Sequence, residues 1–253
     1  MKPYLLSEVN WEMLKDFRYD LAILPWGATE AHNYHLPYGT DNFESSSIAE
    51  YSAKKAWDKG GKIVVLPNIP YGVNTGQSDI YLDMNIMPST QLSIIRDLLT
   101  VLSRQGIKKF LILNSHGGND FKWMLRELGL EFPDMLLLSC DWFKSIPKTK
   151  FFSNTGDHAD EMETSLIMHL YPDLVLPLDQ AGEGKEIYSK IKGIREGWAW
   201  SERKWSKVTK DTGIGNPKEA SAEKGKDCFE EVTTKISDLI MDILKVKGND
   251  HYE

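Results

Sequence analysis

The sequence of 253 residues has few cysteines and fewer basic than acidic residues. Its two cysteines, Cys140 and Cys228, are too few and too far apart for a disulfide framework or a thiolate metal site. Lys and Arg number 30 against 37 Asp and Glu, and the net charge of −7 has the wrong sign for binding phosphates. We therefore expect no nucleic-acid partner, and any bound metal should have nitrogen and oxygen ligands.

Long apolar runs are also missing. No stretch of 18 apolar residues occurs, and the N-terminus lacks the apolar region of a signal peptide, so we expect a cytoplasmic protein without membrane contact. The phosphate-binding patterns GxGxxG and GxxxxGK are absent, which disfavours a nucleotide or sugar-phosphate enzyme. The content of hydrophobic residues, 41%, is sufficient for a substantial core, and we expect a single domain over residues 1–253.

Four short apolar runs alternate with segments of helical spacing. The runs cover residues 21–24, 62–66, 110–113 and 135–138, and such unbroken apolar runs are typical of parallel strands buried on both faces. Helices are predicted over residues 49–57, from a cap at Pro88-Ser89 to a stop at Gly106, and over 120–128 with a stop at Gly129. An amphipathic helix over 217–246, with a break near Gly225, closes the chain. The alternation predicts a layered α/β domain.

The first segment that indicates chemistry follows the first predicted strand. Glu30 and His32 are two residues apart, so in an extended chain both side chains project to one side, and Asp41 follows after a turn. The loop after a strand lies at the carboxyl edge of a parallel sheet, where such sheets build their sites. We therefore favour metal ligation by these three residues over an ordinary surface pair.

Two further segments bring histidine and carboxylate to the same edge. His116 follows the third predicted strand in the sequence Asn-Ser-His-Gly-Gly-Asn. A lone histidine is more often a buried structural residue, but Gly117 and Gly118 allow backbone to approach a ligand and to orient a carbonyl oxygen. The third segment begins at His158 and contains Asp160, Glu161 and Glu163 before an apolar helix. By themselves these acidic residues fit a solvated helix start that compensates the helix dipole.

Together these three segments resemble the creatininase (creatinine amidohydrolase) family. The resemblance extends to residues 213–225, which are similar to that family's closing Gly-Asp-Pro and Ala-Glu-Lys-Gly segments. It implies a three-layer α/β/α fold with a mostly parallel sheet and two divalent metal ions per subunit, which are zinc, manganese or iron. It also implies hydrolysis of a non-peptide C–N bond by metal-activated water, a small amide substrate, and a homohexamer.

The resemblance also assigns roles to residues. It implies Glu30, Asp41 and His116 as ligands of one metal, and His32 with a bridging Asp41 as ligands of the second. His158 matches the catalytic histidine of the family, and we expect it to protonate the leaving nitrogen.

One departure from the family pattern leaves the second metal short of a ligand. Creatinine-cleaving members have a carboxylate at the position of Gly118 and an aromatic residue at that of Gly117. We predict Glu163 as the replacement ligand, or as a proton shuttle if the second metal is absent. Glu161 and Asp160 stay open as alternatives, because helical periodicity does not distinguish them. The departure also weakens creatinine as the substrate.

The leading hypothesis is a metal-dependent hydrolase of a cyclic amide or a formamide. Gly117, Gly118, Trp142 and Tyr34 are the predicted substrate-binding residues, with packing as the alternative role of Trp142 and Tyr34. The rival hypothesis is a non-catalytic metal-binding sensor or scaffold on the same fold, since a fold does not determine a function.

Overall fold

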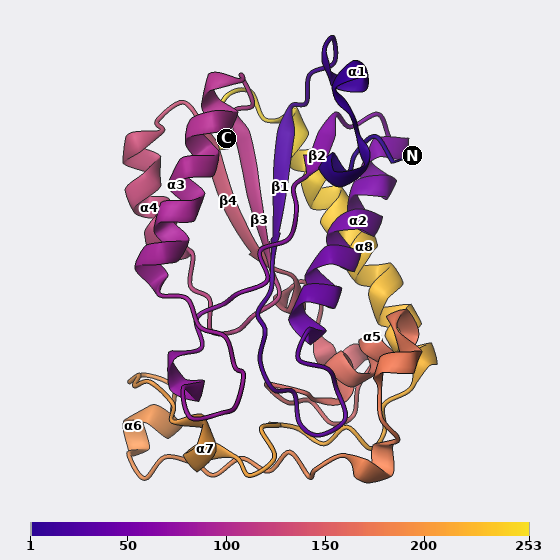
Figure 1. Cartoon of the computed structure of the whole chain (residues 1–253), viewed down its shortest axis with the longest axis vertical. Coiled ribbons are helices and arrows are strands. Elements are labelled where there is room, and N and C mark those ends of the chain that lie inside the picture. Colours follow the sequence, from indigo (N-terminus) through magenta and orange to yellow (C-terminus); the bar gives the residue numbers. More distant parts are fainter. Residues whose placement is uncertain (1, 253) are drawn as a thin grey trace.

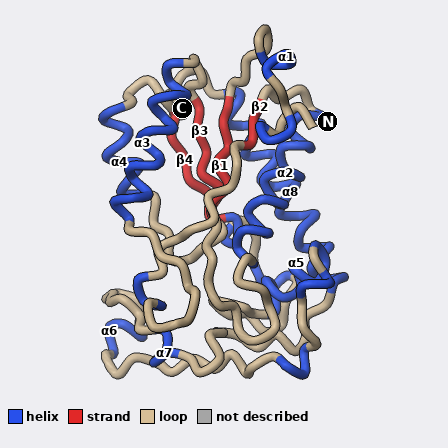
Figure 2. Tube along the Cα trace, in the orientation of Figure 1, coloured by secondary structure: helices blue, strands red, loops and turns tan. Residues whose placement is uncertain are grey.

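The computed structural model describes residues 2–252, and its centre is a sheet of four parallel strands (Figure 2). The strands are β1 (Leu21–Trp26), β2 (Ile63–Val65), β3 (Lys109–Asn114) and β4 (Leu136–Asp141), in the order β2-β1-β3-β4. In register, Leu21 of β1 lies beside Ile63 of β2 and Lys109 of β3. Each predicted apolar run contributes a strand, and all pairs in this sheet are parallel.

Helices cover both faces of the sheet (Figure 1). One face carries α2 (Thr40–Asp58) and α8 (Ala222–Lys245), and the other carries α3 (Pro88–Arg104) and α4 (Lys122–Glu131). The alternation of side chains along β1 divides the core accordingly: Leu21 and Ile23 pack toward α2 and α8, while Ala22 and Leu24 pack toward α3 and α4. The three-layer α/β/α prediction is confirmed.

The carboxyl ends of the strands lead into long connections that fill the lower half of Figure 1. These connections include the 3-10 helix η2 (Thr75–Gln77) and the short helices α6 (Lys192–Arg195) and α7 (Trp205–Val208). α5 (Glu161–Leu170) lies beside them and packs against α8 and α2. α1 (Trp11–Leu14) is at the opposite end. The segments that the sequence singled out therefore meet at one end of the molecule.

Several helix boundaries differ from the prediction. α2 begins at Thr40 rather than near residue 49, because its polar first turn is buried in the site instead of facing solvent. α4 continues past Gly129 to Glu131. At the start of α3, Pro88 occupies the first turn but no side chain caps the helix, so the predicted cap at Pro88-Ser89 is wrong.

The predicted break at Gly225 is also wrong, because α8 runs unbroken from its cap at Ser221. A Cβ atom on Gly225 would lie 1.9 Å from the backbone oxygen of Ser165 in α5, so the glycine serves close packing of two helices. In the described part of the chain, no helix has the length and apolar character needed to cross a membrane.

Candidate metal centre

The predicted ligands converge at the carboxyl end of the sheet. Glu30 and His32 lie in the loop after β1, Asp41 in the first turn of α2, His116 after β3, and Glu163 in the first turn of α5. All five side chains are buried. Nitrogen and oxygen atoms lie within 4.8 Å of one another in three groups: Glu30, Asp41 and His116; His32, Asp41 and Glu163; Glu30, His32 and His158.

The first group surrounds one nitrogen of His116. Its Nδ1 atom is 2.8 Å from Oε1 of Glu30 and 3.1 Å from Oδ2 of Asp41. Its Nε2 atom is 3.1 Å from the backbone oxygen of Val73. Because a carbonyl oxygen only accepts hydrogen bonds, Nε2 carries a proton, and Nδ1 faces the two carboxylate oxygens. Either a proton on Nδ1 or a bound cation between the three atoms can balance the charge of the two carboxylates.

The second group surrounds one nitrogen of His32. Its Nδ1 atom donates to the backbone oxygen of Glu30 at 3.1 Å, and its Nε2 atom is 3.0 Å from Oδ1 of Asp41 and 3.9 Å from Oε2 of Glu163. Asp41 therefore faces a different histidine with each carboxylate oxygen. Within the described chain, its Oδ2 atom accepts no hydrogen bond. This arrangement fits a carboxylate that bridges two metal ions.

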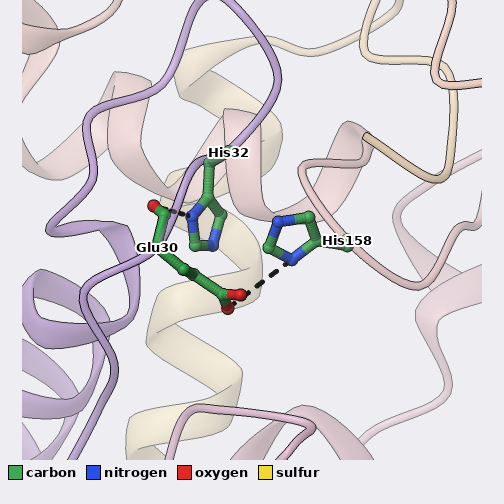
Figure 3. Close-up of side chains that lie close together, drawn as sticks. All are labelled: Glu30, His32 and His158. Carbon is green, nitrogen blue, oxygen red and sulfur yellow. Dashed lines mark hydrogen bonds and ion pairs between the residues drawn. The ribbon is translucent and has the colours of Figure 1, made fainter. Parts of the chain in front are cut away.

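His158 completes the cluster (Figure 3). It precedes α5, and its backbone pairs with Ile214 across an isolated bridge. Its Nε2 atom donates to the backbone oxygen of Ala31 at 2.9 Å, and its Nδ1 atom is 3.9 Å from Oε1 of Glu30. In all three histidines one nitrogen thus donates to a backbone carbonyl and the other faces the site, which is how proteins orient metal-binding and catalytic imidazoles.

The clustered groups shift one another's pKa values. Burial by itself lowers the pKa of His32, but the Asp41 carboxylate beside it raises this pKa to about 10. The pKa of His116 is likewise raised well above its ordinary value, against the effect of burial, by Glu30 and Asp41. Burial raises the pKa of Glu163 to about 8. The buried carboxylates thus favour positive charge within the site, which protons on the histidines or bound cations can supply.

Among the three carboxylates considered for the second metal, Glu163 alone belongs to the cluster. Asp160 is the N-cap of α5: its Oδ1 atom accepts from the backbone N–H groups of Met162 and Glu163. Glu161 points toward α8 and accepts a hydrogen bond from Nζ of Lys224 at 2.6 Å. Because α5 begins at Glu161 with Asp160 as its N-cap, the three carboxylates point in three different directions.

The residues that hold the proposed ligands in place through hydrogen bonds were not identified from the sequence. Asn114 accepts hydrogen bonds through Oδ1 from the backbone N–H of His116 and from Nδ2 of Asn119. Oδ1 of Asn119 in turn accepts from the backbone N–H of Val73, whose carbonyl oxygen orients the His116 ring. Gln77 of η2 donates to Oε2 of Glu30. The spacing Asn-x-His-x-x-Asn was a usable signal for the asparagines, whereas no local pattern marks Gln77.

A cavity of about 150 Å³ opens on the cluster. Gly117 and Gly118, the glycines predicted to bind substrate, are among the residues that line it. Gly117 has open space around its Cα atom, but a Cβ atom on Gly118 would lie 2.4 Å from both Nε2 of His116 and the oxygen of Val73. Gly118, where the sequence departs from the family pattern, therefore has no room for a larger side chain in this chain.

Two residues predicted as cavity walls, with packing as the alternative, do not line the cavity. Trp142 is fully buried and outside the cavity lining, and its indole N–H donates to Oγ of Ser115 at 2.5 Å. Tyr34 is 60% exposed and also outside the lining. The aromatic residues of the lining are instead Phe143 and Trp205, and the ring of Trp205 meets that of His158 edge-on at 5.4 Å. Arg203 stacks over Trp205 at 4.4 Å and pairs with Asp157.

A family model for creatinine amidohydrolases matches residues 7–240. The chain belongs to the creatininase family. As a member of that family, it is similar to a solved candidate creatinine amidohydrolase from Bacteroides fragilis NCTC 9343. The TM-score is 0.92 at 39% identity, and all of both chains is covered.

Two curated relatives of this creatininase-family chain act on different substrates. It is 24% identical to creatinine amidohydrolase of Pseudomonas putida over 201 residues, 69% of this chain and 74% of the relative. It is 25% identical to a mycofactocin precursor peptide peptidase of Mycolicibacterium smegmatis over 227 residues, 87% of this chain and 84% of the relative.

Creatininase structures described as a Zn-Zn type and a manganese form share the fold, with TM-scores of 0.77 and 0.80 at 20% identity. The buried nitrogen and oxygen donors in this chain, divided into groups that share Asp41, fit a binuclear metal site.

Proposed function

We propose that this chain is a metal-dependent hydrolase that cleaves a non-peptide C–N bond in a small amide. The observation that carries the proposal is the sharing of Asp41 between two donor groups beside a cavity that also contains His158. Glu30 and His116 complete the first group, and His32 and Glu163 complete the second. The donor set suits zinc, manganese or iron.

Two ions in these positions would supply an activated water and polarise the carbonyl group of the substrate. The protein residues hold the donors in place. His116 and His32 are fixed by their hydrogen bonds to backbone carbonyls, and Glu30 is held by Gln77. Glu163 supplies the carboxylate for which the His116 ring and the Val73 carbonyl leave no room at Gly118.

His158 is the proton carrier in this proposal. Its Nε2 atom donates its proton in a hydrogen bond to the carbonyl oxygen of Ala31, so its Nδ1 atom can accept a proton on the cavity side. When the water oxygen bonds to the carbonyl carbon, Nδ1 takes the water proton. It returns this proton to the nitrogen as the C–N bond breaks, which leaves a carboxylic acid and an amine.

The cavity supports a small polar substrate. Its volume is about 150 Å³, and Asn74, Lys148 and Arg203 are among its lining residues. Relatives that hydrolyse creatinine and a precursor peptide both cleave C–N bonds. Because Gly117 and Gly118 replace the aromatic and acidic residues of creatinine-cleaving members, we favour another cyclic amide or a formamide.

The test is an assay of protein loaded separately with zinc, manganese and iron(II) on creatinine, other cyclic amides, formamides and short peptides. We expect turnover of a cyclic amide or a formamide that a chelator abolishes and added metal restores. Cleavage of peptides alone would contradict the proposed bond type. Absence of turnover at full metal occupancy would favour a non-catalytic metal-binding sensor or scaffold.

A further inference from the structure

A serine at the end of β3 has a hydroxyl proton without an acceptor in residues 2–252. The backbone N–H of Ser115 donates to the oxygen of Trp26 at 3.0 Å, which continues the pairing of β3 with β1. Its Oγ atom accepts a hydrogen bond from the indole N–H of Trp142 at 2.5 Å. An indole N–H only donates, so the serine oxygen is the acceptor and its own proton must point elsewhere.

The hydroxyl group of Ser115 has the cavity beside it, because Ser115 is one of the residues that line this cavity. Side chains alternate along β3, so Ser115 shares the sheet face of Leu111 and Leu113, which pack in the core that includes Met162 of α5. Ser115 and Met162 both line the cavity, together with His116 and Glu163. The side chain of Ser115 is nearly enclosed, with 4% of the residue exposed. Its hydroxyl group is thus a donor beside the proposed metal ligands.

We propose that Ser115 is a further catalytic residue, which donates a hydrogen bond to the acyl oxygen of the bound amide. Trp142 is then a positioning residue, because its indole N–H occupies one lone pair of Oγ and limits the directions open to the hydroxyl proton. This inference rests on the proposed hydrolase function. It also gives a physical role to Trp142, which the sequence had suggested as a cavity wall.

The chemical step keeps the proton on Ser115. The water oxygen forms a bond to the carbonyl carbon, and the electron pair of the C=O π bond moves onto the acyl oxygen. The hydroxyl group of Ser115 donates to this oxygen while it carries negative charge. The carbonyl re-forms as the C–N bond breaks, and the nitrogen leaves with the proton that His158 supplies.

A purely structural serine would only satisfy the buried indole N–H, and three variants separate the two roles. Ser115→Ala removes the hydroxyl and leaves the indole N–H unpaired, which lowers the melting temperature. Trp142→Phe removes the indole N–H. The double variant Ser115→Ala/Trp142→Phe removes both partners, so no buried donor is left unpaired.

The experiment measures kcat/KM for the amide found in the substrate panel, the melting temperature, the zinc content, and the Kd for acetohydroxamate of the zinc-loaded protein. We expect Ser115→Ala to lower kcat/KM by about 100-fold. We also expect it to weaken acetohydroxamate binding by about 5-fold with zinc content unchanged. The double variant should recover melting temperature relative to Ser115→Ala while kcat/KM stays low. Recovery of kcat/KM together with melting temperature would overturn the proposal.

Ser165→Ala is the matched control. Ser165 is also a fully buried serine, and its hydroxyl donates to the backbone oxygen of Glu161 in α5, outside the cavity lining. We expect this variant to lose stability and to keep its kcat/KM. Acetohydroxamate binding tests the hydrogen bond from Ser115 independently of the proposed hydrolase function. If no amide is turned over but Ser115→Ala still weakens acetohydroxamate, the donor is supported and hydrolysis is not. If Ser115→Ala binds acetohydroxamate as tightly as the unaltered protein, the role of Ser115 is refuted.

Discussion

Nε2 of His158 donates a hydrogen bond to the backbone oxygen of Ala31 at 2.9 Å. Ala31 stands between Glu30 and His32, so the same loop that carries two proposed ligands also determines which nitrogen of His158 faces the cavity. The backbone N–H of Ala31 donates to Oδ1 of Asp83 at 2.7 Å. The geometry of the ligand loop and the tautomer of the proposed proton carrier are thus linked through one residue.

Two roles are open to His158, proton carrier and metal ligand, and one variant distinguishes them. As proton carrier, it touches the reacting atoms without holding a metal, so His158→Ala should lower kcat/KM by about 10²- to 10⁴-fold at unchanged metal content. Its Nδ1 atom also belongs to a donor group with Glu30 and His32. Elemental analysis of the purified variant decides between the roles, because loss of metal would make His158 a ligand.

Glu163 and Glu161 provide a matched pair for the second metal position. We expect Glu163→Gln to lower the bound metal content by about half, because it removes one of three donors around that ion. Glu161→Gln should keep the metal and lose about 1–3 kcal/mol of stability, since its ion pair with Lys224 is lost. Metal content by mass spectrometry and thermal unfolding report the two effects. Equal metal loss in both variants would contradict the assignment.

Gly118 and Gly117 provide a second matched pair. A Cβ atom on Gly118 would press on the His116 ring and on the Val73 carbonyl that orients it. We therefore expect Gly118→Ala to cost about 1–3 kcal/mol and to weaken metal binding. Gly117→Ala meets no atom within 4 Å and should change neither quantity. A stable Gly118→Glu variant with full metal occupancy would contradict this prediction, because the backbone at Val73 would then have to move to make room for the side chain.

The pH dependence of stability should carry a contribution from Asp83. Burial raises the pKa of Asp83 from its ordinary value of 3.8 to about 7, although the Ala31 N–H acts in the opposite direction. The folded protein therefore holds this proton more tightly than the unfolded chain does. The corresponding stability is fully present below pH 3.8 and is lost as the pH rises toward 7.

We accordingly expect Asp83→Asn to flatten the dependence of the melting temperature on pH between 4 and 7 relative to the unaltered protein. The asparagine oxygen can still accept the hydrogen bond from Ala31, so the ligand loop keeps its anchor. Differential scanning calorimetry across this range is the measurement. Parallel profiles for the two proteins would show that Asp83 ionises as an ordinary surface acid.

Local sequence signals were sufficient for the sheet and for the approximate position of the site. A parallel strand covered on both faces must be apolar along its whole length, which made residues 21–24 and 110–113 recognisable. Parallel strands also end at one edge, so Glu30 and His116 could be placed together without knowledge of the loops. The start of α2 could not be placed, since Thr40 and Asp41 are polar residues that only the site buries.

What the sequence by itself determined is the layered fold, the edge that carries the chemistry and the nitrogen and oxygen character of the donors, because each depends on residue type and spacing along one segment. The tertiary structure alone decided that Glu163 joins the cluster while Asp160 caps α5 and Glu161 pairs with Lys224. It also placed Trp142 behind Ser115 instead of in the cavity wall. These outcomes depend on which partners other segments bring within hydrogen-bond distance, and periodicity along a single helix or strand does not contain that information.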